Sequence, residues 1–223
     1  MSHRRYAIYY VPPSGVFARF GAEWLGWDID TGKTTSQPDL PGLAQITERP
    51  RRYGFHATLK PPFRLADGAD IRQLRDAVAE VACDVAPASC DGLELSRLGR
   101  FLALTAVGDA AAVSQVASDC VAKLDGFRAA STEAELAARQ KSRLSDRQQR
   151  TLERWGYPYV MEDFRFHMTL TGQLPKADIA FWTETLRARM PDLPSPFVLD
   201  AITLVGERED GHFEVIQRYP LTG

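Results

Sequence analysis

The chain contains the same seven-residue pattern twice, and this repeat constrains the fold more than any other feature of the sequence. YGFHATL occupies residues 53–59, and FRFHMTL occupies residues 164–170. Both segments are predicted to be strands, because apolar side chains alternate with small or polar ones and successive side chains of a strand point to opposite faces. One face of each strand is suited to a hydrophobic core. The other face carries His56, Thr58, His167 and Thr169.

The segments that follow each copy have the same order of expected elements. The pattern predicts a helix over 68–83 and a hairpin over 93–107 in the first half, and a helix over 176–190 and a hairpin over 197–221 in the second. This weak repeat around a strong local motif suggests two similar halves related by a pseudo-twofold axis. We expect a single domain over residues 1–223, with a polar helical insertion at about 131–155.

The segments ahead of and just after the first copy give further local predictions. Residues 5–11 favour a strand, and residues 14–29 favour a helix with Ser14 as its N-cap. Residues 31–50 are rich in glycine and proline, which predicts a loop. The Pro-Pro-Phe at 61–63 is interpreted as a turn that ends the first motif strand.

Two histidines that face each other across a cleft suit acid–base chemistry on a phosphodiester. An imidazole titrates near pH 6.5, so one ring can be neutral and accept a proton while the other is charged and donates one. The base deprotonates an attacking water or hydroxyl, and the acid protonates the departing alkoxide. Two threonine hydroxyls can donate hydrogen bonds to the equatorial phosphate oxygens. Such a site requires neither a metal nor another cofactor, and the four histidines lack paired metal-ligand spacing.

The tetrapeptides at 56–59 and 167–170 resemble the paired H-x-T/S-x (HxTx) signature of the two-histidine (2H) phosphoesterase superfamily. The words YGFHATLKPPF, WGYPYV and FRFHMTLTG are similar to a bacterial branch of that superfamily, often found beside phosphonate-utilisation genes. Through the repeat, the resemblance covers essentially the whole chain. It implies an α+β fold of two similar lobes, each an antiparallel sheet with flanking helices, around a central cleft. It also implies that His56 and His167 are the acid and the base, while Thr58 and Thr169 bind phosphate oxygens.

Two cations are candidates for substrate binding beside the motifs. Lys60 and Arg165 lie on the expected polar face of their own strands, where a phosphate would use such side chains. The alternative is that each is a charge at the rim of the cleft. Lys60 is the weaker candidate, because Pro61 follows it directly.

Other side chains could contribute to the site, although each has a plain structural interpretation. In the expected insertion, one basic helix face consists of Arg139, Arg143, Arg147, Arg150 and Arg154. A solvated helix surface is the simpler interpretation, and a lid that closes over a phosphorylated substrate is the alternative. Tyr6, Tyr9, Tyr10, Tyr157 and Tyr159 could stack on a base or a sugar, although packing beside the core is the simpler role.

Charge and composition limit the partners and the compartment. The formal net charge is −2, which gives no positive field for long nucleic acid but permits a small anionic substrate in a locally basic cleft. Three cysteines without paired spacing indicate reduced thiols in the cytoplasm. The first residues make a poor signal peptide, and no stretch approaches the roughly 20 apolar residues of a membrane span.

The leading hypothesis is a metal-independent phosphodiesterase that hydrolyses a small cyclic or ribose-derived phosphodiester, with a link to phosphonate metabolism implied by the resemblance. The first alternative is an RNA 2′,3′-cyclic phosphodiesterase or another enzyme that processes RNA ends. The second alternative is a module that binds phosphate esters without turning them over. The sequence leaves the oligomeric state open.

Overall fold

The computed structural model describes residues 3–133, 135 and 144–223. The strands are β1 (Tyr6–Tyr10), β2 (Trp27–Asp28), β3 (Lys33–Thr34), β4 (Ala57–Phe63), β5 (Ala88–Cys90), β6 (Gly92–Leu98), β7 (Phe101–Val107), β8 (His167–Thr169), β9 (Phe197–Leu199), β10 (Ala201–Glu207) and β11 (Phe213–Pro220). The helices are α1 (Val16–Leu25), α2 (Leu43–Arg51), α3 (Ile71–Asp84), α4 (Ala111–Lys123), α6 (Asp146–Trp155) and α7 (Ile179–Arg187). Short 3₁₀ turns are η1 (Asp125–Phe127), η2 (Met161–Asp163) and η3 (Lys176–Asp178).

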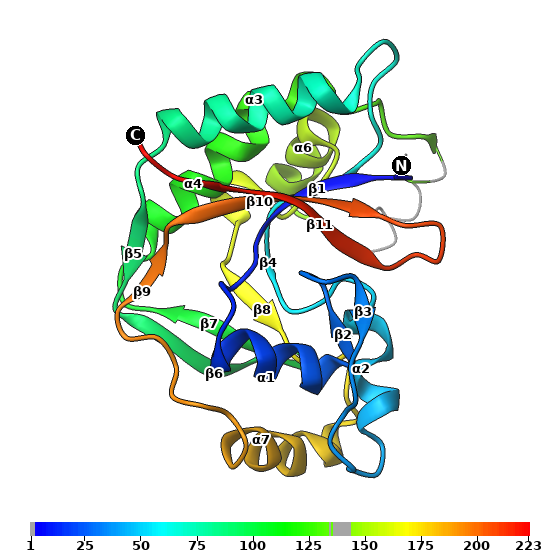
Figure 1. The fold of residues 1–223 in the computed structure, drawn as a ribbon, viewed down its shortest axis with the longest axis vertical. Helices are drawn as coiled ribbons and strands as arrows, with labels where there is room; N and C mark the ends of the chain where they lie inside the picture. Colours follow the sequence, from blue (N-terminus) through cyan, green and yellow to red (C-terminus); the bar gives the residue numbers. More distant parts are fainter. Residues whose placement is uncertain (1–2, 134, 136–143) are drawn as a thin grey trace.

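The main architectural element is one antiparallel sheet with the strand order β11-β10-β1-β4-β8-β7-β6 (Figure 1). The mixed helix and strand content agrees with the expected α+β class. The expectation that each half forms a separate sheet is wrong, because β4 of the first half and β8 of the second half pair with each other. The two motif strands are therefore neighbours in the middle of a continuous sheet.

The two halves of the chain also exchange their hairpins. The first-half hairpin β6–β7 pairs with β8, whereas the second-half hairpin β10–β11 pairs with β1. The segments that follow α3 and α7, β5 and β9, form a separate antiparallel pair. Pairing of equivalent strands is compatible with a pseudo-twofold axis, although the symmetry of whole lobes stays a prediction.

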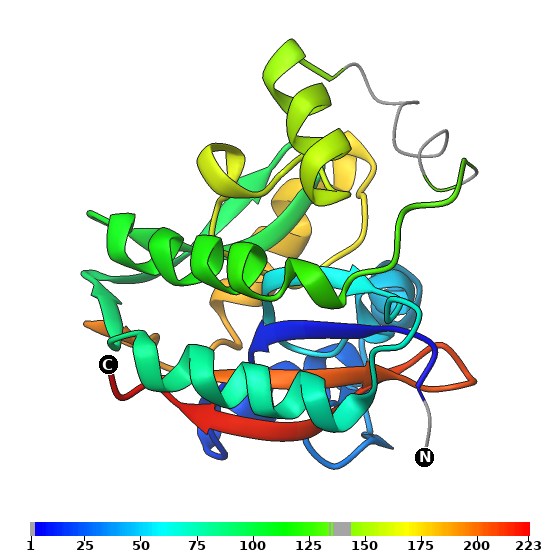
Figure 2. The same cartoon turned by 90° about the horizontal axis from the view of Figure 1, so that it is seen from above.

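The two faces of the sheet have different coverings. On one face, Tyr6, Ile8 and Tyr10 join the large core under α3 and α4, which run beside each other across the strands (Figure 2). On the other face, a second buried cluster is formed by Ala7, Tyr9, Val11, Trp27, Ile29, Val205 and Phe213. This second cluster covers only the β1–β10–β11 part of that face. The motif residues next to it on β4 and β8 are partly exposed.

Local sequence signals explain where several elements begin. Asp70 caps α3 in a capping box with Gln73, which fits the predicted helix. The predicted Ser14 cap of α1 is wrong, since Gly15 is the N-cap and makes no side-chain bond. The loop predicted over 31–50 contains α2, and the predicted turn at 61–63 is part of β4.

The expected insertion at 131–155 is described only in part. Residues 146–155 form α6, which begins at a capping box between Ser145 and Gln148. Arg147 of α6 forms a bidentate ion pair with Asp163, with N–O distances of 2.8 and 3.0 Å. Arg139 and Arg143 of the expected basic face lie outside the described residues, so the lid hypothesis stays a prediction. Within the described ranges, no helix is long and apolar enough to cross a membrane.

We expect Gly21→Ala to destabilise the protein, although the same change normally stabilises a helix interior by about 1 kcal/mol. A Cβ at Gly21 would overlap the ring of Phe55, which is 2% exposed and precedes His56. The cost should be about 1–3 kcal/mol in urea-induced unfolding, as for other overpacked sites. Gly126→Ala is the matched control, because a Cβ there meets open space. Equal unfolding midpoints for the two variants would contradict this packing account.

Candidate active site

The register between β4 and β8 determines which motif residues meet. Ala57 lies opposite Met168, and these two side chains are buried in the core at 1% and 0% exposure. Extending the antiparallel register by one residue in each direction puts His56 opposite Thr169, and Thr58 opposite His167. Because side chains alternate along a strand, all four lie on the face away from Ala57 and Met168.

This register also makes the two motifs locally symmetric. In an antiparallel pair, a twofold axis between Ala57 and Met168 exchanges His56 with His167 and Thr58 with Thr169. Residues directly opposite have Cβ atoms about 4.5–5.5 Å apart, and diagonal neighbours lie about 7–8 Å apart. The two histidines are diagonal neighbours. A group the size of a phosphate would reach both imidazoles and both hydroxyls from this spacing.

Both imidazoles are oriented by the same local contact. His56 Nδ1 lies 2.9 Å from the carbonyl oxygen of Gly54, and His167 Nδ1 lies 2.8 Å from that of Arg165. A carbonyl oxygen only accepts hydrogen bonds, so each Nδ1 carries a proton and donates it. In the neutral rings, Nε2 is therefore the basic nitrogen. Each histidine thus has its backbone-facing nitrogen occupied, and its outer nitrogen is the one that could accept a proton.

Gly54 supplies its carbonyl from a backbone conformation that other residues rarely adopt. Its φ is 71°, and a Cβ there would lie 2.6 Å from Cβ of Ile29. Arg165, at the same place in the second motif, has no positive φ. The motif glycine therefore serves to position His56, a role that the sequence analysis did not assign.

The surroundings of the two histidines differ. The Tyr9 ring stacks on His56 with centroids 3.8 Å apart, and Tyr53 lies 6.2 Å away. His56 Nε2 also lies 3.1 Å from the hydroxyl oxygen of Thr58. Burial lowers the pKa of His56 from 6.5 to about 4, the Gly54 bond opposes this shift, and the charge of His167 adds to it. His56 is therefore neutral at pH 7.

The row of side chains across the sheet extends beyond the motifs. Thr58 lies opposite Tyr9, and Tyr9 lies opposite Thr203 on β10. On the other side, His167 lies opposite Thr105 on β7. The Thr105 hydroxyl donates to the hydroxyl of Ser96 at 2.8 Å. Of these flanking residues, only Tyr9 was considered from the sequence, because the others share no motif with the histidines.

The expectation that Lys60 shares the histidine face is wrong. The register shifts between Tyr9–Thr58 and Ile8–Lys60, so one extra residue of β4 is inserted there. The bulge turns Lys60 to the opposite face, where it is 2% exposed and its Nζ donates to the Val121 carbonyl at 3.0 Å. Its carboxylate neighbour is Asp125, at 3.5 Å. Lys60 therefore contributes to the packing of α4 on β4 and lies apart from the histidine pair.

Arg165 remains exposed beside the second motif. Its carbonyl oxygen accepts the hydrogen bond from His167 described above. A contact between its guanidinium and substrate stays a prediction.

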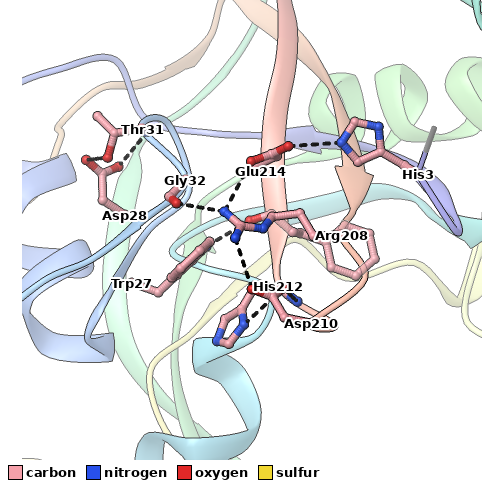
Figure 3. A network of polar contacts seen from close by, with 10 residues as sticks. His3, Trp27, Asp28, Thr31, Gly32, Arg208, Asp210, His212 and Glu214 are labelled. Carbon is pink, nitrogen blue, oxygen red and sulfur yellow. Dashed lines mark hydrogen bonds and ion pairs between the residues drawn. The ribbon is translucent and has the colours of Figure 1, made fainter. Parts of the chain in front are cut away.

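Polar and aromatic contacts join the β2–β3 hairpin to the β10–β11 hairpin (Figure 3). Arg208 in the β10–β11 turn donates to the carbonyl of Gly32 at 2.9 Å, and its guanidinium lies 5.4 Å from the Trp27 ring. Trp27 Nε1 donates to the Phe213 carbonyl at 2.8 Å, and the His212 ring lies 4.3 Å from that of Trp27. These contacts fix the β2–β3 hairpin over the second buried cluster, which includes the tyrosine stacked on His56.

A cavity of about 670 Å³ lies between α1 and the β2–β3 hairpin, with Val11, Trp27, Ile29 and Phe55 among its lining residues. Extending the β1–β4 register puts Val11 opposite His56, so one side of this cavity adjoins the histidine face. A smaller cavity is lined by Lys60, Arg64 and Arg128 on the far side of β4. In the part of the chain with described coordinates, no group of three or more His, Cys, Asp or Glu could hold a metal ion.

Comparison with known families places the chain. A family model described as "Protein of unknown function (DUF1045)" matches residues 58–214, which is more than half of the sequence. The chain belongs to this family. The match includes the second motif and begins two residues after His56.

Two curated relatives carry the same name, "Ribose 1,5-bisphosphate phosphokinase PhnN". The chain is 37% identical over 235 residues to the protein from Janthinobacterium sp. (strain Marseille), which covers 100% of this chain and 52% of that protein. It is 35% identical over 188 residues to the protein from Laribacter hongkongensis (strain HLHK9), which covers 80% of this chain and 42% of that protein. The chain thus spans about half the length of the curated relatives that it matches.

Two solved structures are similar over nearly the whole chain. One is a crystal structure of the protein TT0787 from Thermus thermophilus, with a TM-score of 0.47, 17% identity and 98% coverage of each chain. The other is described as "Crystal structure of phosphoesterase", with a TM-score of 0.43, 13% identity and 100% coverage of each chain. At these scores the likeness supports no conclusion about this chain.

The position of Lys60 predicts a specific pH dependence of stability. Burial lowers its pKa from 10.5 to about 8, against the opposing effect of Asp125. Between these values the unfolded chain binds more protons, so the free energy of unfolding gains a term that rises with pH. The stability of the wild type should therefore rise relative to that of Lys60→Met by on the order of 2 kcal/mol between pH 7 and 10.

Urea unfolding at several pH values measures this difference. Lys123→Met is the matched control, because Lys123 is 40% exposed and pairs with Asp84 at the surface. A wild-type to Lys60→Met difference that does not change with pH would contradict the assigned burial.

Proposed function

We propose that the protein is a metal-independent phosphodiesterase in which His56 is the general base and His167 is the general acid. The observation that carries this proposal is the Ala57–Met168 register, which brings both histidines and both threonines to one partly exposed face. The matched Nδ1 contacts support it, because they make Nε2 the basic nitrogen of each neutral ring, and His56 Nε2 faces the hydroxyl of Thr58 in the same site. A module that only binds phosphate esters does not need two imidazoles that are both oriented for proton transfer.

The difference between the two environments supports the division of roles. His56 lies against an aromatic ring and is neutral at pH 7, as a base must be before the reaction. His167 is more open and lies at the other end of the diagonal that joins the two histidines. It would deliver its proton to the group that departs on the opposite side of the phosphorus.

The proposed reaction is the hydrolysis of a cyclic phosphodiester. His56 Nε2 takes a proton from a water molecule while the water oxygen bonds to phosphorus. The bond from phosphorus to one ring oxygen breaks, and His167 Nε2 gives its proton to that oxygen. The products are a phosphomonoester and a free hydroxyl on the same molecule. Thr58 and Thr169 donate hydrogen bonds to the phosphate oxygens, whose charge is greatest in the transition state.

A ribose-derived cyclic phosphate is the substrate class that we propose. Both curated relatives are named for ribose 1,5-bisphosphate. Water that opens a 1,2-cyclic phosphate on ribose 5-phosphate, with cleavage at O2, leaves the phosphate on O1 and produces that compound. We propose no phosphokinase activity for this chain, because its sequence lacks the G-x-x-x-x-G-K-[ST] loop that cradles nucleotide phosphates.

A substrate panel tests the class. It should contain the 1,2-cyclic phosphate of ribose 5-phosphate, nucleoside 2′,3′-cyclic phosphates, and RNA oligonucleotides that end in a cyclic phosphate. Turnover of the first compound, followed by ³¹P NMR, supports the proposal. Turnover of RNA ends alone would favour the RNA-processing alternative. Saturable binding of every compound without turnover would favour a binding module.

Replacing either histidine should remove most of the activity. His56→Ala and His167→Ala should each lower kcat by about 10²–10⁴-fold, the usual contribution of one general acid or base. His3→Gln is the matched control, because His3 pairs with Glu214 at 3.0 Å outside the motif strands. Steady-state kinetics on correctly folded variants measures the effect. Wild-type rates in the double variant would refute the assignment.

The pH–rate profile should have an unusually low acid limb. A base works in its neutral form, and the pKa of His56 is about 4, so on the acid side kcat/KM should fall only when the pH drops through about 4. An unperturbed histidine would give that limb near pH 6.5. Stopped-assay rates from about pH 3.5 to about pH 8, a range that brackets both values, measure it, with protein stability checked at each point. A limb near the ordinary histidine value that vanishes in His56→Ala would contradict the assignment of His56 as a base with a depressed pKa.

A further inference from the structure

The tyrosine that stacks on His56 is Tyr9 of β1, which lies outside both seven-residue motifs. Tyr9 is 0% exposed, and its ring plane makes an angle of 26° with the imidazole at 3.8 Å between centroids. It lies opposite Thr58 on β4, so it belongs to the face that carries the motif residues. Its ring therefore covers His56 from the side of β1.

The hydroxyl of Tyr9 does not explain why the residue is there. It is buried without a hydrogen-bond partner among the residues that the structure describes. A buried tyrosine hydroxyl usually finds such a partner, and leaving it unpaired costs free energy. The contact that Tyr9 does make with the candidate site is the face of its ring on the imidazole.

We propose that Tyr9 is a positioning residue for His56. This inference rests on the proposed function, because it assigns to Tyr9 the orientation of the proposed base. The Gly54 carbonyl fixes one nitrogen of the imidazole, and the Tyr9 ring fixes the plane in which the imidazole lies. With both constraints present, Nε2 is held toward Thr58 at 3.1 Å. With the carbonyl contact alone, a single hydrogen bond at Nδ1 would have to hold the imidazole in its plane.

The same ring keeps water away from one side of His56. Phe213 lies 5.9 Å from Tyr9 and 5.3 Å from Tyr53, so the stack continues away from the imidazole as an aromatic cluster. Burial is the largest cause of the depressed His56 pKa. Removing the Tyr9 ring would admit water and raise that pKa toward the ordinary value of a histidine.

Substitutions at Tyr9 separate the ring from its hydroxyl. Tyr9→Phe keeps the ring, so kcat/KM should stay within about twofold of the wild type, as expected when no hydrogen bond is lost. Tyr9→Leu removes the ring, so kcat should fall about tenfold, the size of one aromatic pair, with little change in KM. The acid limb of its pH profile should rise by about one pH unit or more. Tyr9→Met, which fills the space with a flexible chain, replaces the leucine variant if that variant does not fold.

Tyr219→Leu is the control for a purely structural role. Tyr219 is also buried, at 6% exposure, and its hydroxyl also has no partner among the described residues, but it joins the large core on the other face of the sheet. This variant should lose stability and keep the acid limb of the wild type. A Tyr9→Leu profile identical to that of Tyr219→Leu would overturn the proposal. A loss in Tyr9→Phe as large as in Tyr9→Leu would overturn it too, because the hydroxyl would then be the group that matters.

An NMR titration tests the inference without any substrate. The His56 pKa, read from its ring resonances and assigned with His56→Ala, should stay low in Tyr9→Phe and rise in Tyr9→Leu. This result stands or falls separately from turnover. If no phosphodiester is hydrolysed, the proposed function fails while the titration still reports on Tyr9. If turnover is found and the titration is unchanged by Tyr9→Leu, the positioning role alone is refuted.

Discussion

The pairing of β4 with β8 is the interaction on which the candidate site depends. A register shift of one residue would turn one histidine toward the core, because side chains alternate with a period of two. Buried Ala57 and Met168 oppose such a shift, since it would expose an apolar side chain and bury an imidazole. The neighbouring strands β1 and β7 hold the pair from both sides. The geometry at the centre of the sheet is therefore maintained by the core beneath it.

The site combines a symmetric frame with asymmetric surroundings. Each imidazole donates from Nδ1 to the carbonyl two residues earlier, so the backbone treats the two motifs alike. The neighbouring side chains do not, because Tyr9 stacks on His56 at 3.8 Å while Phe101 lies 6.1 Å from His167. Two identical groups need different environments to act as base and acid in one step. The second buried cluster and the hairpin above it supply that difference on one side only.

Sequence periodicity was sufficient to predict the face of the four motif residues, because each motif is short and regular between its aromatic residue and its threonine. The same periodicity gave the wrong face for Lys60, because a β-bulge reverses the alternation there. No residue in that segment is typical of a bulge. The prediction also failed at Pro61 and Pro62, which were expected to end the strand. β8 pairs with β4 only at Ala57, so the later part of β4 can accommodate residues that lack an N–H.

The single sheet could not be predicted, since pairing between distant strands leaves no local pattern. The role of Tyr9 could not be predicted either, because its contact with His56 depends on the pairing of β1 with β4.

The position of β1 has a consequence for how the protein forms during translation. Strand β1 lies between β4 and β10, so its second neighbour is synthesised only after the whole segment from Val11 to Asp200. Until β10 leaves the ribosome, one edge of β1 has no partner, and such an exposed edge invites pairing with other chains. Contacts this distant in sequence also slow folding, because the chain must close a long loop before it gains them. Nascent chains should therefore depend on chaperones or on low local concentration until the β10–β11 hairpin is complete.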